Sequence, residues 1–228
     1  MREIILDTET TGMDPLQGDR IVEIGCVEVE NQVPTGKTYH VYINPERDVP
    51  AEATAVHGIT NDFLKDKPTF GEIVGDFVDF IADSRLVIHN AEFDIKFLNA
   101  ELKMFGFPSM DMRRATDTVK MAREKFPGSP ANLDALCRRF GIDNSNRTLH
   151  GALLDAQLLA EVYLELTGGR QAGFAITEER DSHGLLMGVS LERKHREPRS
   201  FPASDKEKEA HDELIASLKN PLWKKSIN

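Results

Sequence analysis

Two carboxylates, Asp7 and Glu9, lie where an apolar run ends, and residues 2–7 are predicted to form a short buried strand. On an extended chain, residues i and i+2 point to the same face, so these two side chains project side by side. Paired carboxylates repel unless they are protonated or bridged by a cation, and hard divalent cations prefer oxygen ligands. A solvated pair is the commoner explanation of Asp-x-Glu, but the end of a buried strand is a poor place for unpaired charge. A metal site and a solvated pair therefore both fit this segment.

A second polar segment, residues 89–94 (HNAEFD), begins where another predicted strand ends. Asp94 lies in the first turn of the helix expected to follow, where a carboxylate complements the helix dipole without any metal. In the metal interpretation, Asp94 helps to hold a second ion, while Asn90 and Phe93 shape the wall of the site. Taken alone, this segment favours the helix-dipole explanation.

The third segment, residues 150–155 (HGALLD), places His150 just before a predicted helix and Asp155 on it. An imidazole at such a site can accept a proton from water near neutral pH. A surface histidine and a helix-end carboxylate are the simpler explanations of the two residues taken singly. Together, however, the three segments supply four carboxylates and one histidine, which is the set that a two-metal phosphodiesterase needs.

The pattern of apolar residues predicts the elements that must bring these segments together. Strands are predicted over residues 2–7, 20–30, 37–43 and 86–89, with a turn at residues 34–36 between the second and third. A helix is predicted to begin at Thr69, whose capping box with Glu72 precedes apolar positions that continue to Ile81. Further helices are predicted over residues 92–105, 117–126, 132–140 and 151–167. Early strands, later helices and a β-α unit in the middle indicate an α/β fold with a mixed sheet, in which an antiparallel meander joins parallel strands.

The charge of the chain argues against tight, unaided binding of nucleic acid. Residues 1–168 hold 17 Lys and Arg against 28 Asp and Glu, and residues 169–228 hold 11 against 10. Affinity for nucleic acid comes largely from neutralising phosphates, which an acidic body does poorly. Either nucleic acid is not the substrate, or metals offset some carboxylates and a partner supplies most of the grip.

The composition is otherwise that of a soluble globular protein, and we expect a cytoplasmic one. No apolar stretch is long enough for a membrane span, and the first residues carry no cleavage-site pattern of a signal peptide. Cys26 and Cys137 both fall in apolar segments and are interpreted as reduced core residues. We expect an enzymatic domain over residues 1–169, a linker over residues 170–203 and a docking segment over residues 204–228.

The three segments resemble the motifs of the DEDD exonucleases, in the branch that uses histidine as the base. The matching stretches are DTETTG at 7–12, HNAEFD at 89–94 and HGALLDA at 150–156, in the same order and with the same spacing. Within that superfamily the sequence is most similar to the epsilon proofreading subunits of bacterial DNA polymerase III. Supporting stretches are VHGIT at 56–60, KPTF at 67–70, FPG at 126–128, NLDALCRRF at 132–140 and RTLHGALLDAQLLAEVYLELTGG at 147–169. The resemblance implies a ribonuclease-H-like fold.

The resemblance also implies roles for individual residues. Asp7, Glu9 and Asp155 would be direct ligands of two divalent cations, Mg²⁺ or Mn²⁺, Asp94 would complete the acidic set, and His150 would be the general base. Zinc suits this oxygen-rich set less well. The residues expected to contact the substrate are Asp7, Thr8, Glu9, Glu52, His57, Asn90, Phe93 and Asp155.

The implied reaction removes mismatched nucleotides from a 3′ end of DNA, as nucleoside monophosphates. Mismatched ends would be preferred because an unpaired base costs less to unstack. The motifs alone also fit a free-standing exoribonuclease, and a mainly structural subunit of a polymerase is an alternative from another class.

The C-terminal residues bear on the choice between these functions. Ser204 and Glu207 form a second potential capping box, followed by a short amphipathic helix that carries Leu214 and Leu218, and then by Trp223. Trp is favoured as a buried anchor at interfaces, so these residues are expected to bind the polymerase catalytic subunit. A charged tail with one stray aromatic residue is the competing explanation. Residues 171–174 resemble a sliding-clamp peptide, so a sliding clamp is a further candidate partner, together with a small accessory subunit.

Overall fold

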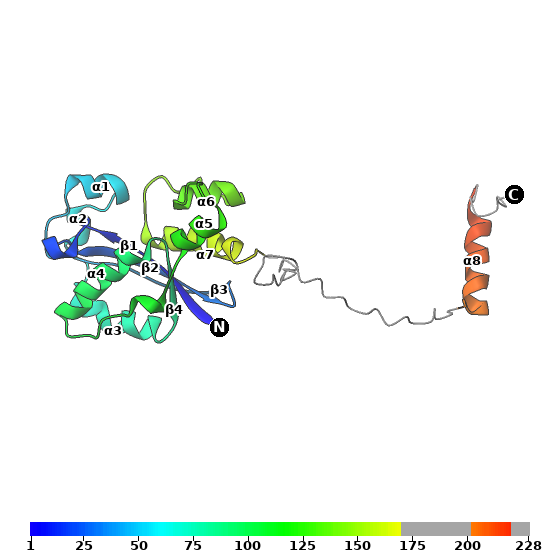
Figure 1. Ribbon diagram of the computed structural model, residues 1–228, viewed down its shortest axis with the longest axis horizontal. Coiled ribbons are helices and arrows are strands. Elements are labelled where there is room, and N and C mark those ends of the chain that lie inside the picture. Colours follow the sequence, from blue (N-terminus) through cyan, green and yellow to red (C-terminus); the bar gives the residue numbers. More distant parts are fainter. Residues whose placement is uncertain (170–201, 220–228) are drawn as a thin grey trace, which may run out of the picture. The chain divides into compact units, whose positions relative to one another are not determined.

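The computed structural model describes residues 1–169 and 202–219 (Figure 1). These two parts belong to separate units of the chain, and each is described by itself. Most of the segment predicted to be a linker, residues 171–174 and Trp223 lie outside the described residues. In the part of the chain that is described, no helix has the length and apolar character needed to cross a membrane.

A five-stranded mixed sheet forms the centre of residues 1–169, in the order β3-β2-β1-β4-β5. Its strands are β1 (Arg2–Thr10), β2 (Ile21–Glu30), β3 (Val33–Tyr42), β4 (Arg85–Ile88) and β5 (Ala115–Asp117). The first three pair antiparallel, whereas β4 runs parallel to β1 and β5 runs parallel to β4. The predicted mixed sheet is therefore confirmed, and β1 is its central strand.

The turn between β2 and β3 is not where the sequence pattern places it. The chain reverses at Asn31 and Gln32, which have φ values of 50° and 68°, and Pro34 already lies within β3. Two consecutive residues with positive φ form the tight hairpin turn that matches the twist of the strands. Pro34 is tolerated because β3 is an edge strand, where the missing N–H costs no ladder hydrogen bond.

Helices cover both faces of the sheet, and each face has its own apolar core. Ile4 and Leu6 of β1 pack with residues of α3 and α4, whereas Ile5 packs with residues of α5, α6 and α7. This division follows from the alternation of side chains along a strand. The helices of residues 1–169 are α1 (Ala51–His57), α2 (Asn61–Leu64), α3 (Phe70–Ile81), α4 (Ala91–Met104), α5 (Thr118–Lys125), α6 (Leu133–Phe140) and α7 (Ala152–Leu166).

The long helices agree with the sequence prediction, and the short elements do not. The capping box at Thr69 is present, with the backbone N–H of Thr69 donating to Glu72 at 2.7 Å. The sequence pattern misses α1, α2, β5 and two 3₁₀ turns, η1 (Pro15–Gln17) and η2 (Met112–Arg114). These elements are too short for an apolar period to distinguish them from loops. Cys26 and Cys137 are free and buried, as predicted.

Two features of the sheet bring the three polar segments to one place. Because β1 and β4 are parallel and Leu6 pairs with Ile88, the residues after these two positions emerge at the same region of the sheet. Helix α7 packs across β1 and β2, and its first turn lies directly on Gly25, the partner of Asp7 in the antiparallel ladder. A Cβ on Gly25 would lie 2.2 Å from the backbone N of Leu153, so only glycine permits this approach.

The second described part is a single helix, α8 (Asp205–Ser217), capped by Ser204. Its predicted capping box is present, because the backbone N–H of Ser204 donates to Glu207 and the Glu207 N–H donates back to the Ser204 hydroxyl. Leu214 lies on α8 and is 60% exposed, whereas Leu218, predicted to lie on the same helix, is the extended residue that follows its end and is 44% exposed.

Candidate active site

Asp7 and Glu9 lie within β1 rather than at its end. The sequence pattern ends this strand at Asp7, but pairing with β2 continues to Thr10, because residues 8–10 remain in the ladder. Their side chains point to the α7 side of the sheet. Ile5 packs on this same face, and Gly25 meets α7 there. Glu9 is 8% exposed, so this carboxylate is held in the protein rather than solvated.

Asp94 is fixed against β1 from the opposite face of the sheet. It lies in the first turn of α4, as predicted, and is 3% exposed. One of its oxygens accepts hydrogen bonds from the backbone N–H of Thr8 at 3.1 Å and from the Thr8 hydroxyl at 2.7 Å. The chain reaches α4 through Asn90, whose positive φ of 69° allows a sharp turn directly after β4. Thr8 therefore supports the acidic group that the helix supplies.

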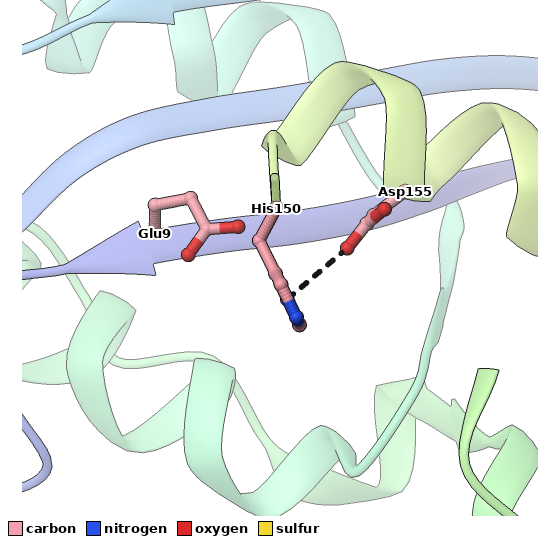
Figure 2. A group of neighbouring side chains, drawn as sticks. All are labelled: Glu9, His150 and Asp155. Atoms are coloured by element: carbon pink, nitrogen blue, oxygen red, sulfur yellow. Dashed lines mark ion pairs between the residues drawn. The ribbon is translucent and has the colours of Figure 1, made fainter. Parts of the chain in front are cut away.

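His150 and Asp155 come from the start of α7 and face Glu9 (Figure 2). Asp155 is 4% exposed, whereas the side chain of His150 is 48% exposed, and its Nδ1 lies 3.6 Å from Asp155 Oδ2. The His150 backbone N–H donates to the carbonyl of Val56 at 3.1 Å, which ties the residue to α1. Ligand atoms of Glu9, His150 and Asp155 all lie within 4.8 Å of one another. One cation can therefore contact residues from a strand and a helix far apart in sequence.

The crowding of carboxylates changes their ionisation. Burial, followed by the charges of Asp94, Glu9 and Asp155, raises the pKa of Asp7 well above its usual range. Burial and the charge of Asp155 raise the pKa of Glu9 to about 8, and burial raises the pKa of Asp94 to about 7. Near neutral pH these groups therefore resist full ionisation unless positive charge is supplied.

A divalent cation fits this site on the chemistry of its donors. The site offers carboxylate oxygens and one imidazole, with no thiolate, and its acids are disfavoured as bare anions by their burial. Hard divalent cations bind such oxygen sets and would remove the electrostatic penalty. The donors present thus match the metal chemistry that the sequence predicts.

The sequence interpretation misses Arg147, which lies between two carboxylates. Its guanidinium donates to both oxygens of Asp155, at 2.6 and 2.7 Å, and to both oxygens of Asp134, each at 3.0 Å. It also lies 3.0 Å from Nδ1 of His150, and its side chain is 8% exposed. Nothing in the residue type marks it, although it begins the segment RTLHGALLDA that carries the base and the last acid.

Glu23 is a second residue that the sequence interpretation misses. It pairs with Glu9 in the ladder, is 2% exposed and contacts His40 Nε2 at 2.7 Å. Its charge contributes to raising the pKa of Asp7 and of Glu9. The alternation of residues 20–30 was the only signal available for its position.

Two adjoining cavities contain the sequence-predicted residues. The catalytic cavity, about 410 Å³, is lined by Asp7, Glu9, Asp94, His150 and Asp155 together with Asn90 and Phe93. A second cavity of about 500 Å³ is lined by Glu52 and His57 of α1. The two cavities share Thr8, Glu9, Met13 and Phe93. All site residues predicted within residues 1–169 thus line two connected cavities. Glu52 and His57 line only the second, whereas Asp7, Asp94 and Asp155 line only the first.

His57 is buried but incompletely satisfied. It is 6% exposed, and its Nδ1 accepts the backbone N–H of Ile59 at 3.0 Å, so the proton of the neutral ring is on Nε2. Within the described residues, Nε2 has no hydrogen-bond partner. Burial lowers the pKa of His57, which keeps the ring neutral near pH 7. A hydrogen bond with the Thr10 backbone acts on this pKa in the opposite direction, more weakly than burial does.

Known proteins resemble the chain in sequence. The family model described as Exonuclease matches residues 4–163. The DNA polymerase III subunit epsilon of Rickettsia felis is 53% identical over 222 residues, which cover 96% of this chain and 97% of that one. The subunit of the same name from Escherichia coli is 47% identical over 220 residues, covering 92% of this chain and 90% of that one.

Solved structures resemble the chain in fold. Exonuclease X, solved in complex with 5′-overhanging duplex DNA, has a TM-score of 0.57 and 27% identity, covering 72% of this chain and 90% of that one. The nuclease domain of 3′hExo, a DEDDh family member bound to rAMP, has a TM-score of 0.62 and 20% identity with the same coverage. The fold is therefore the ribonuclease-H-like fold of the DEDDh exonucleases. With this fold, the acidic site and the extent of the sequence matches, the chain belongs to the family of DNA polymerase III epsilon subunits, the 3′→5′ exonucleases that proofread DNA replication.

Proposed function

We propose that the catalytic cavity hydrolyses the last phosphodiester at a 3′ end of DNA, with two divalent cations, Mg²⁺ or Mn²⁺, held by Asp7, Glu9, Asp94 and Asp155. The observation that carries the proposal is the convergence of Glu9, His150 and Asp155, whose ligand atoms lie within 4.8 Å of one another. When bound, the cations would supply an activated nucleophile and offset charge on the leaving oxygen. The raised pKa values of Asp7, Glu9 and Asp94 support this assignment, because none of these three carboxylates forms an ion pair with a described residue, whereas Asp155 is paired with Arg147.

His150 acts as the general base in this proposal. Its half-exposed imidazole lies at the mouth of the acidic group, 3.6 Å from Asp155, where it can take a proton from the attacking water. Water attacks phosphorus, the bond to the 3′ oxygen of the penultimate nucleotide breaks, and a nucleoside 5′-monophosphate leaves. Asp155 stabilises the imidazolium that forms.

The second cavity, here called the nucleoside cavity, receives the terminal nucleoside. Met13 and Phe93 give it apolar walls for a base, and Glu52 and His57 give it polar groups for the sugar. The unpartnered Nε2–H of His57 would donate to a substrate oxygen, while the exposed carboxylate of Glu52 would accept a hydroxyl proton. Frayed, mismatched ends would enter more readily because their bases are already unpaired.

The C-terminal residues bind the polymerase catalytic subunit in this proposal. Leu214 is exposed on α8 and Leu218 is exposed directly after its last residue, where a docking segment can present both, and Trp223 follows in sequence. A domain over residues 1–169, a linker over residues 170–203 and a docking segment over residues 204–228 would then be separate in function. A DNA-binding partner would also compensate for the acidic body.

The test uses the purified full chain with Mg²⁺ or Mn²⁺ and primers labelled at the 5′ end. Three primers are compared: matched DNA, DNA with a 3′ mismatch, and RNA. We expect stepwise shortening from the 3′ end that is fastest on mismatched DNA. The His150→Ala variant controls for contaminating nucleases and should be inactive. Preference for RNA would support an exoribonuclease instead, and no metal-dependent shortening would leave only a structural role.

A further inference from the structure

A third cavity, of about 590 Å³, adjoins the catalytic cavity away from the nucleoside cavity. It is lined by the β4–α4 turn, the first turns of α5 and residues 129–132. It shares His89, Asn90 and Asn132 with the catalytic cavity and no lining residue with the nucleoside cavity. The three cavities therefore follow one another, with the acidic group in the middle.

The chemistry of the reaction gives this order a direction. The scissile phosphate joins the terminal nucleoside, on one side, to the 3′ oxygen of the penultimate nucleotide, on the other. If the terminal nucleoside occupies the nucleoside cavity and the phosphate lies at the carboxylates, the remaining strand must leave from the opposite side. The third cavity is the depression that adjoins the catalytic cavity and shares no lining residue with the nucleoside cavity.

The third cavity also contains two basic side chains that form no ion pair with a described residue. Lys120 and Arg123 are three positions apart on α5, so they share one helix face, and both are exposed. Neither forms an ion pair with any residue that the structure describes. The cavity has two acids, of which Asp117 is engaged in capping α5 through the N–H groups of Val119, at 2.9 Å, and Lys120, at 3.4 Å. Glu92 is the other.

We propose that the third cavity binds the phosphates of the nucleotides immediately upstream of the scissile bond, through Lys120 and Arg123. The inference rests on the proposed position of the terminal nucleoside and extends it. In a body whose first 168 residues hold 17 basic against 28 acidic residues, two unpaired cations beside the catalytic cavity give the upstream strand a local path. Each phosphate so neutralised contributes a salt-dependent share of the affinity.

The experiment compares a substrate that has an upstream strand with one that lacks it. The first is a tetrathymidylate, and the second is the p-nitrophenyl ester of thymidine 5′-monophosphate, whose leaving group is not a nucleotide. The full-length Lys120→Gln/Arg123→Gln variant removes the two cations. The Lys103→Gln/Arg138→Gln variant is the matched control, because it removes the same charge from exposed residues that line none of the three cavities.

We expect the Lys120→Gln/Arg123→Gln variant to have a KM for the tetrathymidylate roughly tenfold higher at low salt. The slope of log(kcat/KM) against log salt should also become shallower by about 1.4, because each of the two phosphates contributes ~0.7 on a single strand. Hydrolysis of the p-nitrophenyl ester should be unchanged, and the control variant should match the wild type on both substrates. An equal loss on both substrates, an equal loss in the control variant, or no loss on the tetrathymidylate would each overturn the inference. Failure of the wild type to hydrolyse either substrate would instead refute the proposed function.

A neutral phosphate provides a second, independent readout. A tetrathymidylate with a methylphosphonate at the linkage next to the scissile one removes the proposed contact from the substrate side. Wild-type kcat/KM should fall by several-fold on this substrate, whereas the Lys120→Gln/Arg123→Gln variant should lose little more, because the two changes remove the same interaction. Additive losses would show that these cations contact no phosphate at this position.

Discussion

Arg147 determines how Asp155 is held before any cation arrives. Its fork of donors fits both carboxylate oxygens of Asp155, and its other edge is anchored on Asp134. Because Asp155 is 4% exposed, loss of its partner would leave a buried charge without compensation. Arg147 therefore positions the carboxylate of Asp155, which is proposed to hold a cation, and the half-exposed Asp134 positions Arg147.

Replacing Arg147 by Met should destabilise the cation-free protein by about 3 kcal/mol, in line with breaking a buried ion pair. Urea unfolding in the presence of a chelator measures the change. Asp134→Asn is the matched comparison: the Asp134 side chain is 49% exposed, so its pair should contribute less than about 1 kcal/mol. An Arg147→Met protein that unfolds at the wild-type urea concentration would show that the pair contributes nothing.

The raised pKa values predict that the cation-free protein becomes less stable as the pH rises. Glu9 binds its proton more tightly when folded, with a pKa of about 8 against 4.5 for an ordinary glutamate, so its contribution is present at acid pH and is lost as pH passes through about 8. Asp94, with a pKa of about 7, acts in the same direction. The Tm in a chelator should therefore fall between about pH 5 and about pH 8. Added Mn²⁺ should raise the Tm more at the upper pH.

The Glu9→Gln variant is the control for this pH dependence. An amide does not titrate, so the decline in Tm should be smaller and the response to Mn²⁺ weaker. A wild-type Tm that rises over the same interval would contradict the assigned direction. Activity should be lost in the variant, because Glu9 is proposed to hold a cation.

The sequence predicts which acids and which histidine come together, because the three polar segments occur in the order and with the spacing of the DEDD exonuclease motifs that they resemble. Asp7, Glu9, Asp94, His150 and Asp155 all line the catalytic cavity. Arg147 and Glu23 could not be identified in this way, because a single arginine or a glutamate on an alternating strand has no pattern of its own. Their importance comes from partners that only the folded chain brings near, Asp155 for Arg147 and Glu9 for Glu23.

At the scale of elements, the contact between β2 and α7 decides where the base and the last acid lie. Gly25 permits it, because any side chain there would meet the backbone of Ala152 and Leu153. A backbone obstacle cannot rotate away as a side chain can. The missing side chain at Gly25 of β2 therefore determines where α7 starts. It also determines where His150 and Asp155 lie.

The Gly25→Ala variant should lose several kcal/mol of stability and most of its activity, because an added methyl of this kind overpacks the contact and shifts α7. Thermal unfolding and hydrolysis of the p-nitrophenyl ester would measure the two effects. Gly75→Ala is the matched control: Gly75 is exposed in α3, has open space around its Cβ position, and should gain up to ~1 kcal/mol from the better helix former. Equal behaviour of the two variants would show that the close approach is unimportant.

The long elements could be predicted from sequence, and the short ones could not. Helices α3 and α7 and strand β2 have enough residues to display an apolar period. Strand β5 has three residues and α2 has four, so their structure depends on neighbours, such as the pairing of β5 with β4. The turn at Asn31 and Gln32 was misplaced because Pro34-Thr35-Gly36 is the stronger local turn signal, and the sheet overrides it.

At the scale of the whole chain, catalysis and association are assigned to different parts. The residues proposed to be catalytic fall between positions 7 and 155, and the exposed leucines lie at position 214 on α8 and at position 218 directly after it. The acidic character of residues 1–168 makes unaided binding to DNA weak and strongly dependent on local cations. Association with a polymerase would bring the 3′ end to the site at a high effective concentration.

The full-length Leu214→Asp/Leu218→Asp variant should lose binding to the purified polymerase catalytic subunit, since charge is disfavoured at the core of an interface. Its kcat/KM on the p-nitrophenyl ester should equal that of the wild type. Co-elution in size-exclusion chromatography and the ester assay measure these two properties. Val33→Asp, at an exposed residue of the edge strand β3, is the control and should leave both unchanged. Retained co-elution of the α8 variant would refute docking through these leucines.

The place of α7 in the chain has a consequence for the protein during its own synthesis. Helix α7 is the last element of residues 1–169, and the proposed base, His150, directly precedes it, while one of the four proposed acids, Asp155, lies on it. A nascent chain that has emerged from the ribosome only as far as α6 has Asp7, Glu9 and Asp94, but no His150. Since chains emerge at roughly 5–20 residues per second, His150 emerges some seconds after Asp94. The order of residues along the gene thus delays hydrolysis until the proposed exonuclease domain, residues 1–169, is complete.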